Sequence, residues 1–469
     1  MRAKIPSEVQ ALRELVLTQA RQIQELRERL ELLERENAEL RSRLGQTSRN
    51  SHRPPSSDGY CKKTTRPALP KPQGKPRGGQ PGHSGKTLER SLAVDEVVEE
   101  LPKQCRVCQR EFTRKDVRSW GASRQVFDLP AVRLRVTEHR LAEVCCCGQI
   151  HLGEFACHVP ASVQYGPNLR ALATKLSIEQ RLPSAQVAGL LNELYGTSFS
   201  ERSLELTLQK AVQLSKPLRQ SIAAELRQSD ILHFDETAVR VAGQLQWLHV
   251  ASNAQGTQLM LHSKRGQEAL KSKASLWKDF RGVAVHDCWS AYSDEGRRRH
   301  ALCGAHLLRE LAALQEQRTI WAAGIHEFLL GLHDNSRRAP PAASILREYH
   351  RLLGQADAAE PQPWKPPSKR GRPKATKGRN LLRRLQQHEA AVLRFALEEG
   401  VPFTNNQAER DLRPLKVKQK ISGGWRSRQG ANNYAALQSL LSSWRKQGKD
   451  VLCCLRELFT QAAALSTAS

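Results

Sequence analysis

The sequence contains no long apolar run, and this absence sets the first limit on what the chain can be. No stretch has the length and composition of a membrane span, and none has the pattern of a basic amphipathic anchor. The first ten residues, MRAKIPSEVQ, lack the apolar segment of a secretory signal. We therefore expect a cytoplasmic protein without a membrane partner.

Acidic residues are scarce relative to basic ones. Asp and Glu number 47 against 74 Lys and Arg, which gives a formal net charge of +27. An enzyme of small molecules has no need of such an excess, so we expect a polyanion as partner. Nucleic acid fits best, because Lys and Arg release counterions from its phosphates. The length of 469 residues predicts several domains. Eleven cysteines in an intracellular chain indicate metal ligands and reduced thiols rather than disulfides.

Residues 7–44 carry a heptad pattern with charged flanks. Its two core series are Val16, Ile23, Leu30, Asn37 and Leu44, and Leu12, Gln19, Leu26, Leu33 and Leu40. A buried Asn at one core position usually favours two strands. The pattern predicts a self-associating coiled coil, against the alternative of one helix packed on its own chain. Residues 45–90 are rich in Pro, Gly, Ser and basic residues, which predicts a flexible basic linker or an arm along a DNA backbone.

Residues 91–160 contain two close groups of cysteines. Two cysteine pairs a few tens of residues apart are typical of a zinc ribbon, in which four thiolates surround one Zn²⁺. In a strand Cys145 and Cys147 point to one face and Cys146 to the other, so we expect the first two to bind. The predicted ligands are Cys105, Cys108, Cys145 and Cys147. A buried cluster of reduced cysteines is the alternative, and substitute ligands are Cys157, His158 and His151.

Residues 161–222 are expected to be helical and to bind DNA. Gly196 is a turn residue between two apolar-periodic segments, and Ser200 is suited to cap the second one. Two short helices around a glycine turn fit a helix-turn-helix, although an ordinary helical hairpin has the same pattern.

Three β-like runs follow, ILHFDETAVRV, LQWLHVASN and TQLMLHSKRG, and then a helical stretch around 268–277. A fourth strand in GVAVHDCWSAY ends at Asp287, and HALCGAHLLREL starts as a short fifth strand and continues as a helix. This is the element order of a ribonuclease-H-like sheet. Asp235 ends the apolar part of the first strand, where an ionised carboxylate is costly unless something pairs with it. In such a sheet, the acids at the ends of the first and fourth strands, Asp235 and Asp287, meet at one edge.

Glu409 is the candidate third acid, because Asn405 or Asn406 can cap a helix that carries it. Its alternative role is an ordinary helical ion pair with Arg413. Three carboxylates at a sheet edge repel one another unless cations bind between them. Hard divalent cations prefer oxygen ligands, so Asp235, Asp287 and Glu409 predict a site for Mg²⁺ or Mn²⁺. Two such ions can promote phosphodiester chemistry.

Four blocks of the sequence carry a family resemblance: HFDETAVRV, HDCWSAY, CGAHLLREL and TNNQAERDLRPLKVKQKISGGWRS. The chain resembles the DDE transposases of the insertion-sequence-66 family over most of its length. The resemblance implies metal-dependent cleavage and strand transfer at the ends of a mobile DNA element, with Asp235, Asp287 and Glu409 as the catalytic acids. Cys303 and His306 match the family's C-x-x-H motif, for which we expect structural support.

The expected fold class is multidomain α+β. It combines the N-terminal coiled coil, the zinc-ribbon-like region, the helix-turn-helix-like segment and a ribonuclease-H-like α/β catalytic domain at 225–450. A helical insertion is expected at about 318–396, and a C-terminal helix or tail at 451–469.

Expected partners are double-stranded DNA, at the element ends and the target, and a second copy or more of the chain. Accessory proteins of the same element are further candidates, in a bacterial cytoplasm and on the nucleoid. The predicted DNA-binding residues follow Glu409 or lie in a basic loop: Arg410, Arg413, Lys416, Lys418, Lys420, Arg370 and Arg372. Two other functions fit these features: a ribonuclease-H-like nuclease without transfer activity, and a zinc-dependent DNA-binding regulator with structural acids.

Overall fold

The computed structural model describes residues 7–44, 87–130, 132–147, 149–156, 159–292, 298–334, 340–363 and 375–465. The chain divides into two compact units, Tyr60–Leu134 and the two flanking parts, Met1–Gly59 and Arg135–Ser469. Most of the predicted linker lies outside the described residues, as do Arg370 and Arg372. Among the described residues, no helix is long and apolar enough to cross a bilayer.

Helix α1 (Ser7–Leu44) is one uninterrupted helix with the bounds that the heptad pattern predicts. The apolar residues of the heptad are exposed on it, among them Leu12, Val16, Ile23, Leu26, Leu30, Leu33 and Leu40. A helix with an exposed apolar stripe gains stability only when that stripe is covered. The association of two such helices therefore remains a prediction.

The cysteine-containing region has little regular structure. Residues 87–130 contain one short 3-10 helix, η2 (Arg114–Asp116), and a turn that brings Gln104 opposite Glu111. In the other unit, β1 (Glu143–Cys146) and β2 (Gln149–Leu152) form an antiparallel hairpin. The two predicted cysteine pairs thus belong to different units.

Four helices precede the sheet: α2 (Pro167–Ile178), α3 (Ser184–Tyr195), α4 (Glu201–Leu214) and α5 (Lys216–Arg227). The turn between α3 and α4 has the predicted chemistry. Gly196 ends α3 in the left-handed conformation, with φ of 61°. Ser200 caps α4, because its hydroxyl accepts the N–H of Ser203 at 3.1 Å. Helices α2, α4 and α5 share an apolar cluster with the sheet, to which Ile178 and Leu226 belong. Helix α3 packs in a separate cluster through Val187 and Leu191.

The central sheet has five strands in the order β5-β4-β3-β6-β7. They are β3 (Ile231–Val241), β4 (Gln244–Ser252), β5 (Thr257–His262), β6 (Val283–His286) and β7 (Arg299–Leu302). β3, β4 and β5 pair antiparallel, and β6 and β7 run parallel to β3. The β3–β4 hairpin turns at Ala242 and Gly243, both with positive φ, as a two-residue turn requires.

The helical stretch expected around 268–277 is wrong in length. Only one turn forms there, α6 (Gln267–Leu270). The hydroxyl of Ser275 accepts the N–H of Trp277 at 3.2 Å, and such local side-chain bonds compete with a continuing helix.

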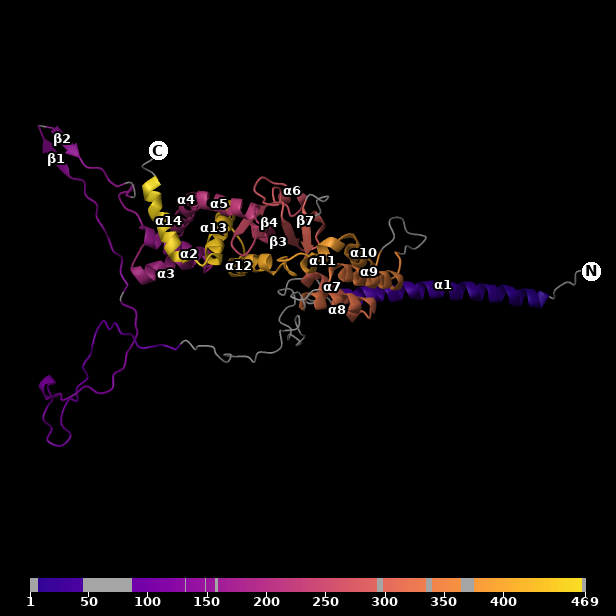
Figure 1. Cartoon of the computed structure of the whole chain (residues 1–469), viewed down its shortest axis with the longest axis horizontal. Coiled ribbons are helices and arrows are strands. Elements are labelled where there is room, and N and C mark those ends of the chain that lie inside the picture. Colours follow the sequence, from indigo (N-terminus) through magenta and orange to yellow (C-terminus); the bar gives the residue numbers. More distant parts are fainter. Residues whose placement is uncertain are drawn as a thin grey trace, which may run out of the picture. The chain divides into compact units, whose positions relative to one another are not determined.

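A group of helices follows β7: α7 (Gly304–Glu316), α8 (Trp321–Asp334), α9 (Ala342–Ala359), α10 (Lys377–Gln387) and α11 (Glu389–Leu397). They build a second apolar cluster around Leu311, Ile325, Tyr349 and Leu382. Figure 1 shows them gathered on one side of the strands. Helices α8 to α11 occupy the interval in which the sequence predicts an insertion.

The last three helices return to the sheet: α12 (Asn406–Ser422), α13 (Arg428–Lys446) and α14 (Val451–Leu465). Helix α12 packs against β3 and β4 (Figure 1). Helix α13 runs along β5, where Ser443 and Ser439 accept the N–H groups of Thr257 and Leu259 at 3.0 and 2.9 Å. These bonds satisfy backbone donors that an open sheet edge would leave unpaired.

Candidate functional site

The pairing of β3 with β6 determines where two of the predicted acids lie. The parallel register joins Ile231 to Val283 and His233 to Val285. Continuing it by two residues brings Asp235 level with Asp287, which directly follows β6. The expectation that Asp235 ends its strand is wrong, because β3 continues to Val241 on the β4 side. The acid instead lies where the pairing with β6 stops.

Helix α12 brings the third acid, and Asn405 fixes the start of that helix. Asn405 is 2% exposed. Its side-chain oxygen bonds Nδ1 of His233 at 2.9 Å, and its amide nitrogen donates to the carbonyl of Phe234 at 2.8 Å. Asn405 precedes the helix but does not cap it with its side chain. It ties the first turn of α12, and Glu409 with it, to the strand that carries Asp235.

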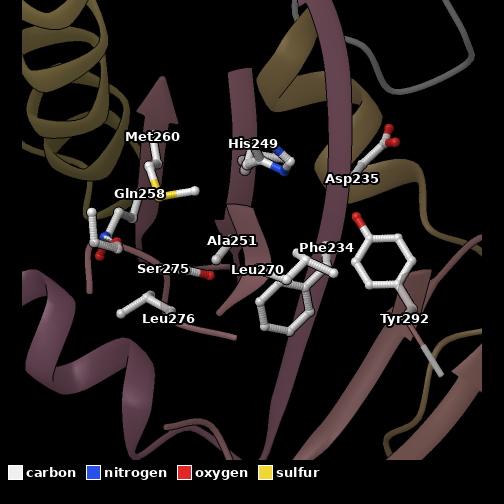
Figure 2. A pocket seen from close by; sticks show the side chains of 12 residues that line it. Phe234, Asp235, His249, Ala251, Gln258, Met260, Leu270, Ser275, Leu276 and Tyr292 are labelled. Atoms are coloured by element: carbon white, nitrogen blue, oxygen red, sulfur yellow. Dashed lines mark hydrogen bonds between the residues drawn. The ribbon is translucent and has the colours of Figure 1, made fainter. Parts of the chain in front are cut away.

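The charges of Asp287 and Glu409 both act on Asp235, and we call this interaction the shared field of the three acids. Burial raises the pKa of Asp235 well above its ordinary value, and the charges of Glu236, Asp287 and Glu409 raise it further. The N–H of Glu236 donates to Oδ1 of Asp235 at 2.8 Å and acts in the opposite direction. The carboxylate of Asp235 and the ring of Phe234 project from opposite sides of β3 (Figure 2). A bound cation would relieve this repulsion.

Glu236 is an acid that the sequence reasoning missed. Its side chain is 1% exposed, and burial raises its pKa. Arg265 holds one carboxylate oxygen through Nε at 2.8 Å and Nη2 at 2.7 Å, and the hydroxyl of Tyr292 donates to the other at 2.5 Å. These partners offset the cost of burying the carboxylate. Glu236 faces the opposite side of β3 from Asp235, because side chains alternate along a strand. Its position next to Asp235 in the sequence therefore did not predict these contacts.

Two tryptophans contact Arg265, and one of them, Trp289, connects that network to the second acid. The guanidinium of Arg265 lies 5.0 Å from the ring centre of Trp247 and 4.1 Å from that of Trp289. The N–H of Trp289 donates to Oδ1 of Asp287 at 3.2 Å. Arg265 therefore contacts Glu236, which follows Asp235, and Trp289, which lies two residues after Asp287. It links the surroundings of the two aspartates.

The basic residues of α12 fall into two groups. Arg413, Lys416 and Lys420 are exposed and recur four, seven and eleven residues after Glu409, which is the spacing of one helix face. The Lys416 ammonium donates to the Ala238 carbonyl at 3.2 Å and is attracted by Asp235. Lys418 instead donates to the carbonyls of Arg181 and Leu182 at 3.2 and 3.0 Å. Arg410 is exposed and donates to Gln407 at 2.9 Å.

The first cysteine pair lies in a turn in which the Cys105 sulfur accepts hydrogen bonds. Hydrogen bonds from the backbone of Cys108, from the backbone of Val107 and from the Cys108 side chain lower the pKa of Cys105. The Val107 N–H lies 3.4 Å from the Cys105 sulfur. Such N–H donors favour the thiolate that a metal requires.

The second cysteine group lies on the β1–β2 hairpin. Cys145 is exposed opposite Ile150, and Cys147 is exposed at the turn, with φ of 53°. His151, a substitute ligand, is on β2. Cys157 and His158 lie outside the described residues.

A group of three metal-capable side chains comes together near α12. One ligand atom each from Cys303, His306 and Glu409 lies within 4.8 Å of the others, and the described part of the chain contains no second such group. At least one pair of the three predicted catalytic carboxylates is therefore farther apart than this. Glu409 belongs both to the shared field of the acids and to this group.

The comparison with known families identifies an enzyme that acts on DNA. Residues 162–433 match the model of the Transposase IS66 family, and the chain belongs to that family. The matched part contains Asp235, Asp287 and Glu409. Residues 3–89 match a family of unknown function (DUF6444). No curated protein matches the chain.

Proposed function

We propose that this chain is the transposase that binds the ends of an insertion sequence, cleaves the DNA there and transfers the strands to a target. The observation that carries the proposal is the shared field of Asp235, Asp287 and Glu409, three acids from β3, the end of β6 and α12. The strand order and directions support a ribonuclease-H-like catalytic domain. The test is strand cleavage by the purified chain on DNA flanking its gene. Cleavage should require Mg²⁺, and cleavage that proceeds equally in chelator would contradict the proposal.

The acids fit a pair of hard divalent cations. Asp235, Asp287 and Glu409 would hold Mg²⁺ or Mn²⁺, because oxygen ligands suit these ions. Burial, and after it the neighbouring acidic charges, raises the pKa of Asp235, and a bound cation would favour its ionised form. Bound ions supply activation of the attacking oxygen and stabilisation of the leaving oxygen at the phosphorus.

The surrounding residues position these acids. Asn405 holds the helix of Glu409 on β3. The Glu236 N–H orients Asp235, and the Trp289 N–H orients Asp287. Arg265 and Tyr292 hold Glu236 in place, which keeps that N–H directed at the first aspartate.

The exposed face of α12 is the proposed phosphate contact beside the acids. Replacing Lys416 and Lys420 with Ala should weaken binding to specific and random DNA alike, because phosphate contacts carry no sequence information. The slope of log K against log salt should flatten by about one unit per lost contact. Lys418→Ala is the matched control, since Lys418 is half-buried and donates to two protein carbonyls, whereas Lys416 and Lys420 are exposed. It should lower thermal stability and leave the slope unchanged. An unchanged slope in the Lys416/Lys420 variant would remove this face from the DNA interface.

Zinc binding by Cys105, Cys108, Cys145 and Cys147 is the second part of the proposal. The N–H donors at the Cys105 sulfur support it. Cys105→Ser should lower the tightly bound zinc by one equivalent per chain, because four ligands are needed for a closed structural site. Metal analysis of the purified full chain measures this. Cys453→Ser, at an exposed cysteine on α14, is the control and should retain the metal. Equal zinc content in the wild type and Cys105→Ser would refute the assignment.

The proposed assembly is a homodimer or higher oligomer formed through α1. Its exposed heptad stripe supports this, and a dimer suits a reaction with two DNA ends. Asn37→Leu should raise the stability of the association and loosen the choice of oligomer. Sedimentation of the full chain and of the variant measures both effects. A wild-type chain that remains monomeric at high micromolar concentration would exclude this assembly.

A further inference from the structure

The beginnings of two helices meet beside the acids. The N–H of Gly304, the first residue of α7, donates to the carbonyl of Phe403 at 2.8 Å. The N–H of Asn405, which precedes α12, donates to the sulfur of Cys303 at 3.2 Å. A side chain at position 304 would meet the Phe403 ring, since its Cβ would lie 2.1 Å from a ring carbon. Only glycine permits this approach, which places Glu409 near the start of α7.

The start of α7 presents two further ligand types at the same place. Cys303 is the residue that caps α7, and His306 is the third residue of that helix. Side chains at these two positions lie side by side, as in a capping box. One ligand atom each from Cys303, His306 and Glu409 lies within 4.8 Å of the others. Donor atoms around one tetrahedral zinc ion are about 3–4 Å apart, so small side-chain rotations would close the set.

The donor chemistry selects the metal. A thiolate with an imidazole and a carboxylate suits Zn²⁺, whereas Mg²⁺ prefers oxygen ligands alone. Burial and the charge of Glu409 raise the pKa of Cys303, whereas backbone hydrogen bonds from Asn405, His306 and Ala305 act in the opposite direction. These donors stabilise the thiolate, and metal binding would release the thiol proton to solvent. Arg309, whose Nη2 lies 3.9 Å from a Glu409 oxygen, is the cation that the metal would compete with.

We propose that Cys303, His306 and Glu409 form a separate site for Zn²⁺, with its fourth position open to water. The site shares Glu409 with the proposed catalytic acids. Zinc binding itself does not depend on the proposed function, but the effect of zinc on the DNA reaction does. A zinc ion held there engages the carboxylate that the Mg²⁺ or Mn²⁺ site requires. Zinc would then inhibit the DNA reaction by occupying the Glu409 carboxylate.

The test counts zinc on the full chain by competition with a chromophoric chelator. The wild type should bind one equivalent more than His306→Asn, and Glu409→Gln should show the same loss. His326→Asn, at a half-buried histidine on α8, is the matched control and should bind as the wild type does. Zinc bound by the cysteine-rich region is common to all four proteins, so it cancels in the comparison.

Cobalt provides a second readout that depends on the thiolate. Co²⁺ added to the wild type should give a sulfur-to-metal charge-transfer band that is weaker in Cys303→Ser, with the difference corresponding to one thiolate. Identical zinc binding by the wild type and His306→Asn, or identical cobalt spectra for the wild type and a folded Cys303→Ser, would overturn the proposal. Neither measurement needs catalysis, so an inactive protein that binds this zinc would contradict the proposed function alone.

Discussion

Replacing Asp235 with Asn is expected to abolish Mg²⁺-dependent cleavage and to leave DNA binding intact. The loss should be on the order of 10³-fold or more, because an electrostatic group at the reacting centre is removed while its size is kept. Asp287→Asn and Glu409→Gln should behave alike. Cleavage rates and DNA affinities of the purified variants measure these effects.

The same substitution should stabilise the folded chain when no divalent ion is present. Burial and the charges of Glu236, Asp287 and Glu409 raise the pKa of Asp235, so its ionised form is strained in the native state. A raised pKa means that this carboxylate lowers stability above its unfolded pKa, and Asn removes that effect. Thermal unfolding in chelator measures it. Glu268→Gln, at an exposed acid on α6, is the control and should change neither stability nor cleavage. An active Asp235→Asn protein would remove this residue from the catalytic set.

Replacing Asn405 with Ala is expected to cause the second large effect, on stability and activity together. The substitution removes the partner of His233 and of the Phe234 carbonyl, both in the interior. Leaving buried polar groups without a partner should lower the free energy of unfolding by about 1–3 kcal/mol. The start of α12 would also lose its attachment to β3, so Glu409 would no longer be held near Asp235.

The neighbouring Asn406 is a matched control for this prediction. It has the same side chain, stands one residue later and is exposed. Asn406→Ala should keep the free energy of unfolding within a few tenths of a kcal/mol of the wild type, as expected for an exposed position. Denaturant unfolding and the cleavage assay compare the two variants. Equal effects at both positions would show that Asn405 acts only as a helix-start residue.

The elements with strong local signals could be predicted from the sequence. The heptad pattern gave α1, and Gly196 and Ser200 gave the turn between α3 and α4, because left-handed glycines and serine caps act within a few residues. The three strands from Ile231 to His262 followed from their β-like runs and the turn residues between them. Lys418 shows the limit of such signals, since only the packing of α12 against the turn after α2 directs its ammonium to Arg181 and Leu182.

The supporting contacts of the site could not be predicted in this way. Asn405 reaches His233 across 172 residues of sequence, and Glu236 reaches Tyr292 across 56. Such pairs depend on which strands become neighbours, and no local period encodes that. The length of α6 was predicted wrongly for a different reason. The helix ends at Leu270, and farther along the Ser275 hydroxyl accepts the N–H of Trp277, a local bond that helix periodicity does not encode.

Detection of joined DNA products is the most direct test of the proposal that Asp235, Asp287 and Glu409 perform strand transfer. The purified wild-type chain is incubated with Mg²⁺, DNA carrying the ends of its own element and an unrelated target plasmid, and the junctions are sequenced. We expect element ends joined to target DNA at defined terminal nucleotides, with no junctions from Asp235→Asn. Mg²⁺-dependent cleavage without junctions would identify a nuclease, and DNA binding without cleavage would identify a regulator. Either result would contradict the proposed transposase function.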